Sequence, residues 1–436
     1  MRKTLLPFQV IGRDFLAARY HAANGDQPGL GKTVQAIHAA QMVGARHVLV
    51  VCPASVRTNW HEHIEEHIGH TRGWDIISYN GATALHLEHP GTLRDKYDVF
   101  IPDEVHFCKS LDSQRTLAIF GRRGLARRAA YKWPLSGTLA PNGRPVELYP
   151  MLKTLCPAFK DMSFGVYAQR YCGAFWDGRS FNVKGASRID ELADILRGFM
   201  IRRTKREVFP GRRAPIISRI PVELSHEDLA AVVAAEDEIG GRQARISSSF
   251  DKFSQLGDTS KLLRLLGGAM VPHVSRFVDD LLETTDKVVV FAHHVDVMRS
   301  LMGYFSRRGY SPVVYRGGMT DAQKDEAKAR FVETNACRVF IGQRQAAGHG
   351  INDLQRACST VVDAEPSWVP GETEQRIDRL DRMGQEDDVV NYYILYARGT
   401  LSAVVVQVHD RKESFGGRLM RDGRTGSALE AFKELL

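Results

Sequence analysis

The sequence predicts an α/β protein of two lobes, each a doubly wound parallel sheet with helices on both faces. The chain has 436 residues, more than one ordinary compact domain holds. Short apolar runs rich in Val, Ile, Phe and Tyr recur in both halves without the polar alternation of a half-buried strand. Each run is followed by a helix-compatible segment. Alternating strands and helices indicate doubly wound lobes, which bind ligands at the carboxyl ends of their strands.

The expected elements follow in order along the chain. The strands are expected at 47–53, 97–104, 131–138, 287–294, 310–317, 337–343, 360–366 and 389–397. Residues from about 224 to 282 contain no clear strand and are dominated by helix-forming residues, which predicts a helical insertion ahead of the second sheet. A stretch with Pro and Arg at 210–221 predicts the boundary, so the expected domains are 1–209 and 210–436.

Charge and cysteine content narrow the class of protein. The net charge is +8, which fits either a solvated basic surface or a polyanionic partner. The basic residues cluster, at 122–128, 202–206 and 212–213, and such clusters suit phosphates. None of the six cysteines forms a Cys-x-x-Cys pair, so we expect neither a zinc site nor disulfides. No stretch is long and apolar enough to span a membrane, and the N-terminus has no secretory pattern. These features predict a soluble intracellular protein without a membrane partner.

The strongest local signal is the phosphate-loop pattern 26-DQPGLGKT-33. Gly29 and Gly31 would free the backbone so that its N–H groups point at phosphate oxygens. Lys32 can reach the outer phosphates, and the hydroxyl of Thr33 can hold Mg²⁺. The general pattern starts with Gly where this segment starts with Asp, so a chance Gly-Lys-Thr turn is the other interpretation of the segment alone.

An acidic pair ends the apolar run in 99-VFIPDEVH-106. Asp103 can hold Mg²⁺, directly or through water, and Glu104 can orient and deprotonate the attacking water. Such a pair alone needs no catalytic role, but a preceding phosphate loop in the same lobe favours one. Ser136 and Thr138 follow the next expected strand, where they could hydrogen-bond the acidic motif and relay its state; alone, they would form a simple turn.

Arginines recur every three residues in 375-QRIDRLDR-382, which places them on roughly one face of a helix. The aspartates between them allow a solvated, salt-bridged helix instead. The functional interpretation is an arginine finger, in which Arg379 and Arg382 of the second lobe stabilise charge on the transferred phosphoryl group. Hydrolysis would then require the lobes to close.

The motifs, in this order, resemble those of the Swi/Snf-type ATPases of helicase superfamily two, closest to the small annealing-helicase, fork-remodelling members. The resemblance covers nearly the whole chain. The segments that carry it are 5-LLPFQVIGRDFL-16, 26-DQPGLGKT-33, 50-VVCPASVRTNW-60, 103-DEVH-106, 135-LSGT-138, 200-MIRRTKREV-208, 288-VVVFAHH-294, 315-YRGGMT-320, 348-GHGIN-352 and 374-EQRIDRLDRMGQ-385.

The resemblance implies two RecA-like lobes with ATP and Mg²⁺ between them. By this resemblance Gln9 reads adenine, and Asp26 takes the acidic first position that the family's phosphate loop also has. Gly348 and Gly350 would lie near the nucleotide.

The resemblance also implies a duplex or branched DNA track contacted by both lobes. Ser55, Arg57 and Trp60 would lie in or beside the DNA-contact motif of the first lobe. The segment 342–352, with Arg344, would couple DNA to the ATP site. This segment departs from the family's pattern, which commonly has Ser-Thr where this chain has Gln-Arg.

These observations predict a monomeric, DNA-dependent ATPase that translocates on duplex DNA and remodels or anneals branched DNA. The alternative is a strand-separating DNA or RNA helicase, although no obvious wedge is visible in the sequence. A nucleic-acid-binding module with an inactive ATPase is disfavoured by the intact Lys32, Asp103, Glu104 and Arg382. No clustered acidic, lysine or histidine residues remain for a nuclease metal site.

Overall fold

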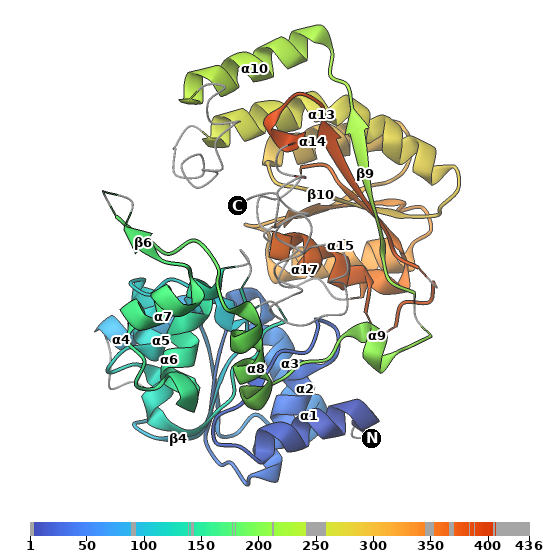
Figure 1. Cartoon of the computed structure of the whole chain (residues 1–436). Coiled ribbons are helices and arrows are strands. Elements are labelled where there is room, and N and C mark those ends of the chain that lie inside the picture. Colours follow the sequence, from blue (N-terminus) through green and yellow to red (C-terminus); the bar gives the residue numbers. More distant parts are fainter. Residues whose placement is uncertain are drawn as a thin grey trace. The chain divides into compact units, whose positions relative to one another are not determined.

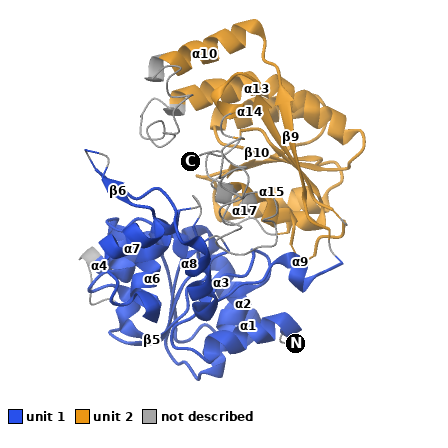
Figure 2. Ribbon diagram, in the orientation of Figure 1, with its two compact units in different colours: residues 1–211, 412–436 blue, residues 212–411 orange. Residues whose placement is uncertain are grey.

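The computed structural model divides into two compact units, residues 1–211 and 212–411, with residues 412–436 grouped with the first (Figure 2). The structure describes residues 4–88, 93–137, 139–140, 144–176, 178, 180–211, 213–240, 259–344, 353–365, 370–382, 384–387, 389–403 and 406. None of the described helices combines the length and the apolar character that crossing a bilayer requires.

Unit 1 contains a parallel sheet of four strands in the order β3-β2-β4-β5. Two short strands, β1 and β8, pair in parallel beside it, and the bridges His21–Lys132 and Asn24–Leu135 join β1 to the β5 side of the sheet. Chain crossovers therefore bring the ends of β1, β4 and β5 to one edge. The strands are β1 (Ala23–Asn24), β2 (Val48–Cys52), β3 (Trp74–Ser78), β4 (Tyr97–Pro102), β5 (Ala129–Lys132) and β8 (Met200–Ile201).

Helices cover both faces of this sheet, because its central strands are apolar on both sides. In β2, Val48 and Val50 pack into one core cluster, whereas Leu49 and Val51 pack into another. Figure 1 shows α1–α3 on one side of the sheet and α4–α7 on the other. The helices are α1 (Pro7–Ala17), α2 (Lys32–Met42), α3 (Arg57–Ile68), α4 (Tyr79–Glu88), α5 (Gln114–Phe120), α6 (Tyr149–Leu155), α7 (Phe164–Tyr171), α8 (Ile189–Phe199) and α9 (Lys205–Val208).

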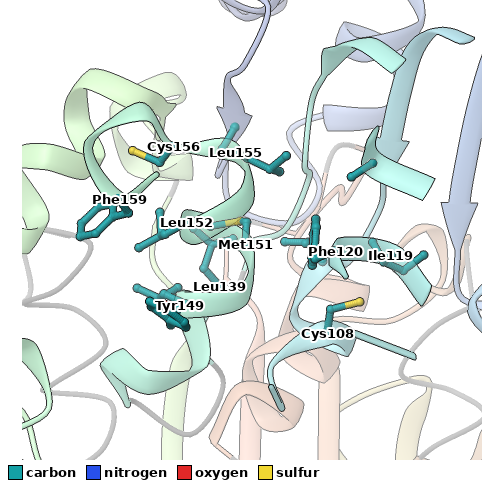
Figure 3. Close-up of a cluster of buried hydrophobic side chains, with 14 of the residues drawn as sticks. Cys108, Ile119, Phe120, Leu139, Tyr149, Met151, Leu152, Leu155, Cys156 and Phe159 are labelled. Atoms are coloured by element: carbon teal, nitrogen blue, oxygen red, sulfur yellow. The ribbon is translucent and has the colours of Figure 1, made fainter. Parts of the chain in front are cut away.

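The α4–α7 side holds the larger core cluster of unit 1 (Figure 3). Met151 and Leu152 of α6 lie between Phe120, at the end of α5, and Phe159. All four side chains are at most 7% exposed, so α5 and α6 form one apolar layer under the sheet. A short antiparallel hairpin, β6 (Phe175–Trp176) and β7 (Phe181–Asn182), extends from this side of the unit (Figure 1).

Unit 2 contains a six-stranded, fully parallel sheet in the order β11-β12-β10-β13-β14-β9. The central strand β10, which reads VVVFA, is buried at every position. The edge strand β9 contains Pro221, which an edge position tolerates. The strands are β9 (Ile216–Val222), β10 (Val288–Ala292), β11 (Val313–Tyr315), β12 (Val339–Gln343), β13 (Thr360–Asp363) and β14 (Asn391–Ala397).

Helices again cover both faces of the sheet in unit 2. Residues of α10, α13 and α14 pack in one core cluster with Val288 and Val290, and residues of α15 and α17 pack in another with Val289 and Phe291. Figure 1 shows the two groups on opposite sides of the strands. The helices are α10 (His226–Gly240), α13 (Thr259–Leu282), α14 (Val295–Arg307), α15 (Asp321–Glu333) and α17 (Pro370–Leu380).

The structure confirms the predicted α/β class with two parallel-sheet lobes and helices in the 224–282 region. One strand of the second sheet, β9, nevertheless precedes these helices rather than following them. The cysteines match the sequence expectation, because all six are buried and none forms a disulfide.

Candidate active site

The phosphate loop of unit 1 connects β1 to the first residue of α2, which is Lys32. Gly29 and Gly31 have φ angles of 88° and 75°, in the left-handed region that residues with a side chain rarely adopt. A Cβ atom on Gly31 would lie 2.4 Å from Nε2 of Gln9. Nζ of Lys32 donates to the carbonyl oxygen of Asp26 across the loop, at 2.8 Å.

A buried network holds the base of this loop. The carboxylate of Asp26 is fully buried and accepts hydrogen bonds from Nε of Arg203 at 3.0 Å and from Nε2 of Gln35 at 3.1 Å. Asn24 donates in turn to Oε1 of Gln35, at 2.9 Å. Asp26 was predicted to bind the nucleotide, but its carboxylate is engaged by Arg203 and Gln35. Its place in the structure is therefore that of a support for the loop.

Gln9, expected to read adenine, lies on α1 against the same loop. Its side-chain oxygen accepts from the backbone of Leu6 at 3.0 Å, and its amide nitrogen donates to the backbone oxygen of Leu30 at 3.3 Å. The side chain is only 5% exposed. Gln9 thus lies beside the phosphate loop, although its amide also ties α1 to that loop.

The acidic pair follows β4, which lies in the sheet between β2 and β5. Oδ2 of Asp103 accepts from Nε1 of Trp60 at 2.8 Å, and Oδ1 accepts from the backbone N–H of Glu104 at 3.0 Å. Burial and then the charge of Glu104 raise the pKa of Asp103 to about 6, while the hydrogen bond from Trp60 and the charge of Lys32 oppose this rise. Asn24, which precedes the phosphate loop, and Asp103 both form β-bridges to Leu135, so unit 1 brings the phosphate loop and the acidic pair together.

Glu104 adopts a left-handed backbone conformation with φ 52°. Non-glycine residues in this region are held there by surrounding contacts and are frequent at functional sites. Oγ of Ser136 donates to Oε2 of Glu104 at 3.1 Å. The same oxygen lies 3.3 Å from Nδ1 of His106, which is 3.0 Å from Oγ of Ser136. The expected link between Ser136 and the acidic motif is present, whereas Thr138 lies outside the described residues.

Arg202 follows β8 and links the segment before the phosphate loop to the segment after β5. Its Nη1 atom donates to the backbone oxygens of Gly25 at 2.5 Å and of Gly137 at 2.8 Å. Gly137 also lies so near the ring of Pro28 that a Cβ atom there would be 2.5 Å from the proline Cδ. The basic cluster at 202–206 was expected to suit phosphates. In the structure, Arg202 and Arg203 instead hold the phosphate loop through hydrogen bonds within the protein.

The arginines of unit 2 have different environments. Arg376 is 1% exposed, pairs with the fully buried Asp363 at 2.7 Å and donates to the hydroxyl of Tyr392 at 2.9 Å. It therefore joins α17 to the sheet. Arg379 and Arg382 are only half-buried, and Arg382 lies just beyond the end of α17. Burial and then the charge of Arg379 lower the pKa of Arg382 to about 10, so the two guanidinium groups are neighbours within unit 2.

The residues expected to contact DNA divide into two groups. Ser55, in the short 3-10 helix Ala54–Val56, and Arg57, the first residue of α3, are both exposed. Trp60 is 1% exposed and Arg344 is 8% exposed, with its Nη1 atom donating to the backbone oxygen of Glu365 at 2.6 Å. The indole of Trp60 and one guanidinium nitrogen of Arg344 thus donate to acceptors inside the protein, and the roles of both segments in DNA binding and coupling stay predictions. Gly348 and Gly350 lie outside the described residues.

Two domain families match segments of this chain. Residues 9–102 match the SNF2-related domain, and residues 273–384 match the helicase conserved C-terminal domain. The chain is 30% identical to the DNA annealing helicase and endonuclease ZRANB3 of Bos taurus, over 100% of the chain and 41% of the relative. It is 29% identical to the SWI/SNF-related matrix-associated actin-dependent regulator of chromatin subfamily A-like protein 1 of Xenopus tropicalis, over 91% of the chain and 43% of the relative. The chain thus spans less than half the length of these relatives.

Among solved structures, the chain is similar to the SWI2/SNF2 ATPase core of Sulfolobus solfataricus in complex with dsDNA. The identity is 19%, the TM-score is 0.44, and the likeness covers 100% of this chain and 96% of the other. The chain carries a match to the SNF2-related domain in its first half and to the helicase conserved C-terminal domain in its second, as the predicted resemblance to the Swi/Snf-type ATPases implies.

Proposed function

We propose that this chain is an ATP-dependent translocase on double-stranded DNA, that duplex DNA stimulates its hydrolysis of ATP, and that it remodels or anneals branched DNA. The observation that carries the proposal is the assembly of Lys32, Asp103 and Glu104 at one edge of a parallel sheet. A cradle for phosphates and a carboxylate pair are the parts that ATP hydrolysis needs.

The residues of unit 1 have distinct roles in the proposed reaction. Lys32 would contact the outer phosphates, and Thr33 and Asp103 would hold Mg²⁺, whose preference for oxygen ligands these side chains satisfy. Glu104 would orient a water molecule and accept its proton as the water attacks the γ-phosphorus. The bond from this phosphorus to the bridging oxygen breaks, giving ADP and phosphate. Ser136, which donates to Glu104, would report the state of the site to the segment after β5.

The finger role of Arg379 and Arg382 is part of the same proposal. Both belong to unit 2, and both side chains are half-buried, so their charge is little screened by water. Hydrolysis would occur when unit 2 brings one of these guanidinium groups to the γ-phosphate held by unit 1. Closure on each turnover would then convert hydrolysis into a step along the track.

Three observations support a DNA track. Arg57 is exposed at the start of α3 and Ser55 is exposed just before it, and Trp60 of the same helix donates to Asp103, so a phosphate contact at Arg57 would reach the active site through one helix. Arg122 and Arg123 add exposed positive charge on unit 1. The names of the relatives include DNA annealing helicases.

The deciding experiment is an ATPase assay with no nucleic acid, single-stranded DNA, duplex DNA, forked DNA and RNA at one salt concentration. We expect duplex or forked DNA to raise the rate several-fold, and displacement of a triplex-forming strand to accompany hydrolysis. Equal rates with and without DNA would refute the coupling. Stimulation by RNA alone would replace a DNA track with an RNA one.

Strand separation is the second candidate, and hairpin β6–β7 favours it. Phe175 and Trp176 are 57% and 66% exposed, and Phe181, which pairs across the hairpin with Trp176, is 38% exposed. Aromatic side chains of this kind stack on unpaired bases. If strand separation is the activity, Trp176→Ala will abolish unwinding of a fork while triplex displacement persists. If the unaltered chain does not unwind a fork, strand separation is excluded as its activity.

A further inference from the structure

Helix α3 carries a cluster of potential metal ligands beyond the residues that serve the active site. In 61-HEHIEEHIGH-70, His63, Glu66 and His67 are spaced by three and four residues, which places them on one face of the helix. One potential ligand atom from each residue lies within 4.8 Å of those of the other two. Among the residues that the structure describes, these three form the group of His, Cys, Asp or Glu side chains whose ligand atoms lie this close together.

A third imidazole, that of His38, reaches the cluster from the neighbouring helix α2. Nε2 of His38 lies 3.0 Å from Nδ1 of His67, and the two rings meet edge to face with centroids 5.1 Å apart. This contact allows the Nδ1–H of His67 to donate to Nε2 of His38, which leaves Nε2 of His67 on the opposite side of its ring.

We propose that this face of α3 binds a divalent transition metal of the Zn²⁺ class through His63, Glu66 and His67, with His38 as the hydrogen-bond partner that orients His67. Two imidazole nitrogens and one carboxylate oxygen suit Zn²⁺, Co²⁺ or Ni²⁺, whereas Mg²⁺ and Ca²⁺ prefer oxygen. A histidine ligand ordinarily makes a second hydrogen bond through its other nitrogen, which is the contact that His38 supplies.

The distances fit a four-coordinate metal after small side-chain rotations. Ligand atoms about 2.0–2.2 Å from a tetrahedral metal lie roughly 3.3–3.6 Å from one another. Nδ1 of His63 and Oε2 of Glu66 are 3.7 Å apart. The side chains of these two residues are 39% and 43% exposed, whereas His67 is 5% exposed. The site therefore combines one fixed, buried ligand with two that solvent reaches, and water would take the fourth position.

The metal site would join the two helices that lead into the active site. Helix α2 begins at Lys32, and α3 carries Trp60, whose indole donates to Asp103. His38 and His67 lie six and seven residues further along their helices, about 10 Å from those positions at the rise of an α-helix. The metal would consequently take no part in hydrolysis. Its effect would be to fix α3 against α2 through the contact of His67 with His38.

The test is a metal titration of the whole chain, purified without a histidine tag and stripped with a chelator. We expect one equivalent of Zn²⁺ to bind in competition with a chromophoric chelator, and Co²⁺ to give the visible absorption of a tetrahedral nitrogen and oxygen site. His63→Ala, His67→Ala and Glu66→Gln should each weaken binding by at least tenfold. His61→Ala and His70→Ala, which alter exposed histidines of the same segment, are the matched controls and should bind as the unaltered chain does.

Two further measurements separate the site from a general loss of structure. Zn²⁺ should raise the melting temperature of the unaltered chain and leave that of Glu66→Gln unchanged, since a ligand stabilises only the fold that binds it. His38→Ala should weaken Zn²⁺ binding by about 10- to 100-fold while the three ligands remain. Absence of Zn²⁺ binding by the unaltered chain would overturn the proposal. Binding that persists in both His63→Ala and Glu66→Gln would overturn it as well.

Discussion

At the scale of single residues, a substitution of Glu104 gives the most direct test of the proposed chemistry. Its carboxylate accepts a hydrogen bond from Ser136 and its backbone is held at φ 52°. Glu104→Gln keeps the shape of the side chain but cannot accept a proton. We expect hydrolysis to fall by about 10²- to 10⁴-fold with ATP binding retained, measured by single-turnover kinetics and nucleotide binding. Glu62→Gln, on the exposed face of α3, is the control. Undiminished turnover would remove Glu104 as the base.

Arg376 belongs to the same periodic run as the proposed fingers, but its contacts predict a different result. Removing its guanidinium leaves the buried carboxylate of Asp363 without its ion-pair partner, which costs about 3–5 kcal/mol in comparable pairs. Arg376→Ala should therefore lower the unfolding midpoint and increase hydrogen exchange in unit 2. Arg398→Ala breaks an exposed ion pair with Glu223 in the same unit and should change little. Normal stability with lost hydrolysis would make Arg376 a finger instead.

Residue types and spacing identified the phosphate loop and the acidic pair, but not which polar side chains are buried. Trp60 and Arg344 stand in motif-like segments that resemble DNA contacts, yet both are turned inward. Arg203 belongs to a basic cluster that predicted a phosphate-binding surface, whereas in the structure its guanidinium donates to the carboxylate of Asp26. Local sequence gives no signal for these pairings, since the partners lie far apart in the chain and meet only in the folded unit.

At the scale of elements, the segment after β5 is the proposed relay between the acidic pair and the rest of unit 1. Ser136→Ala removes one hydrogen bond to a carboxylate, and such bonds contribute about 1.5–3 kcal/mol. If this bond acts in the transition state, hydrolysis should slow by roughly tenfold or more in steady-state assays. Ser110→Ala, exposed in the same unit, should not slow it. An unchanged rate in Ser136→Ala would show that Glu104 is positioned by its backbone and His106.

Among the strands that the sequence predicted, the central ones are apolar throughout. β2 and β10, each with five buried residues, lie inside their sheets, and their apolar composition predicts them. β3 and β9 lie at sheet edges and are mostly half-buried, so their polar residues concealed them. β1, like β8 with which it pairs, is only two residues long, and its pairing depends on contacts across the whole of unit 1. The His63–Glu66–His67 group contains no cysteine, so cysteine spacing gave no signal for it.

At the scale of the whole molecule, the proposed finger requires both units. Arg382→Ala should bind ATP through unit 1 alone, yet lose hydrolysis by about 10³- to 10⁵-fold, the range found for arginine fingers. ATP binding, duplex DNA binding and turnover should be measured on one preparation. Arg356→Ala is the control, because its side chain is 65% exposed in unit 2. Full turnover in Arg382→Ala would direct the same test to Arg379.

The burial of all six cysteines has a practical consequence for the study of closure. Burial raises the pKa of Cys108, Cys172 and Cys358 to about 12, so these thiols hold little of the reactive thiolate at neutral pH. The native chain should therefore react slowly with maleimide dyes. One surface cysteine introduced on each unit could then carry a fluorophore pair, and energy transfer between the dyes would follow the proposed closure of the two units during turnover.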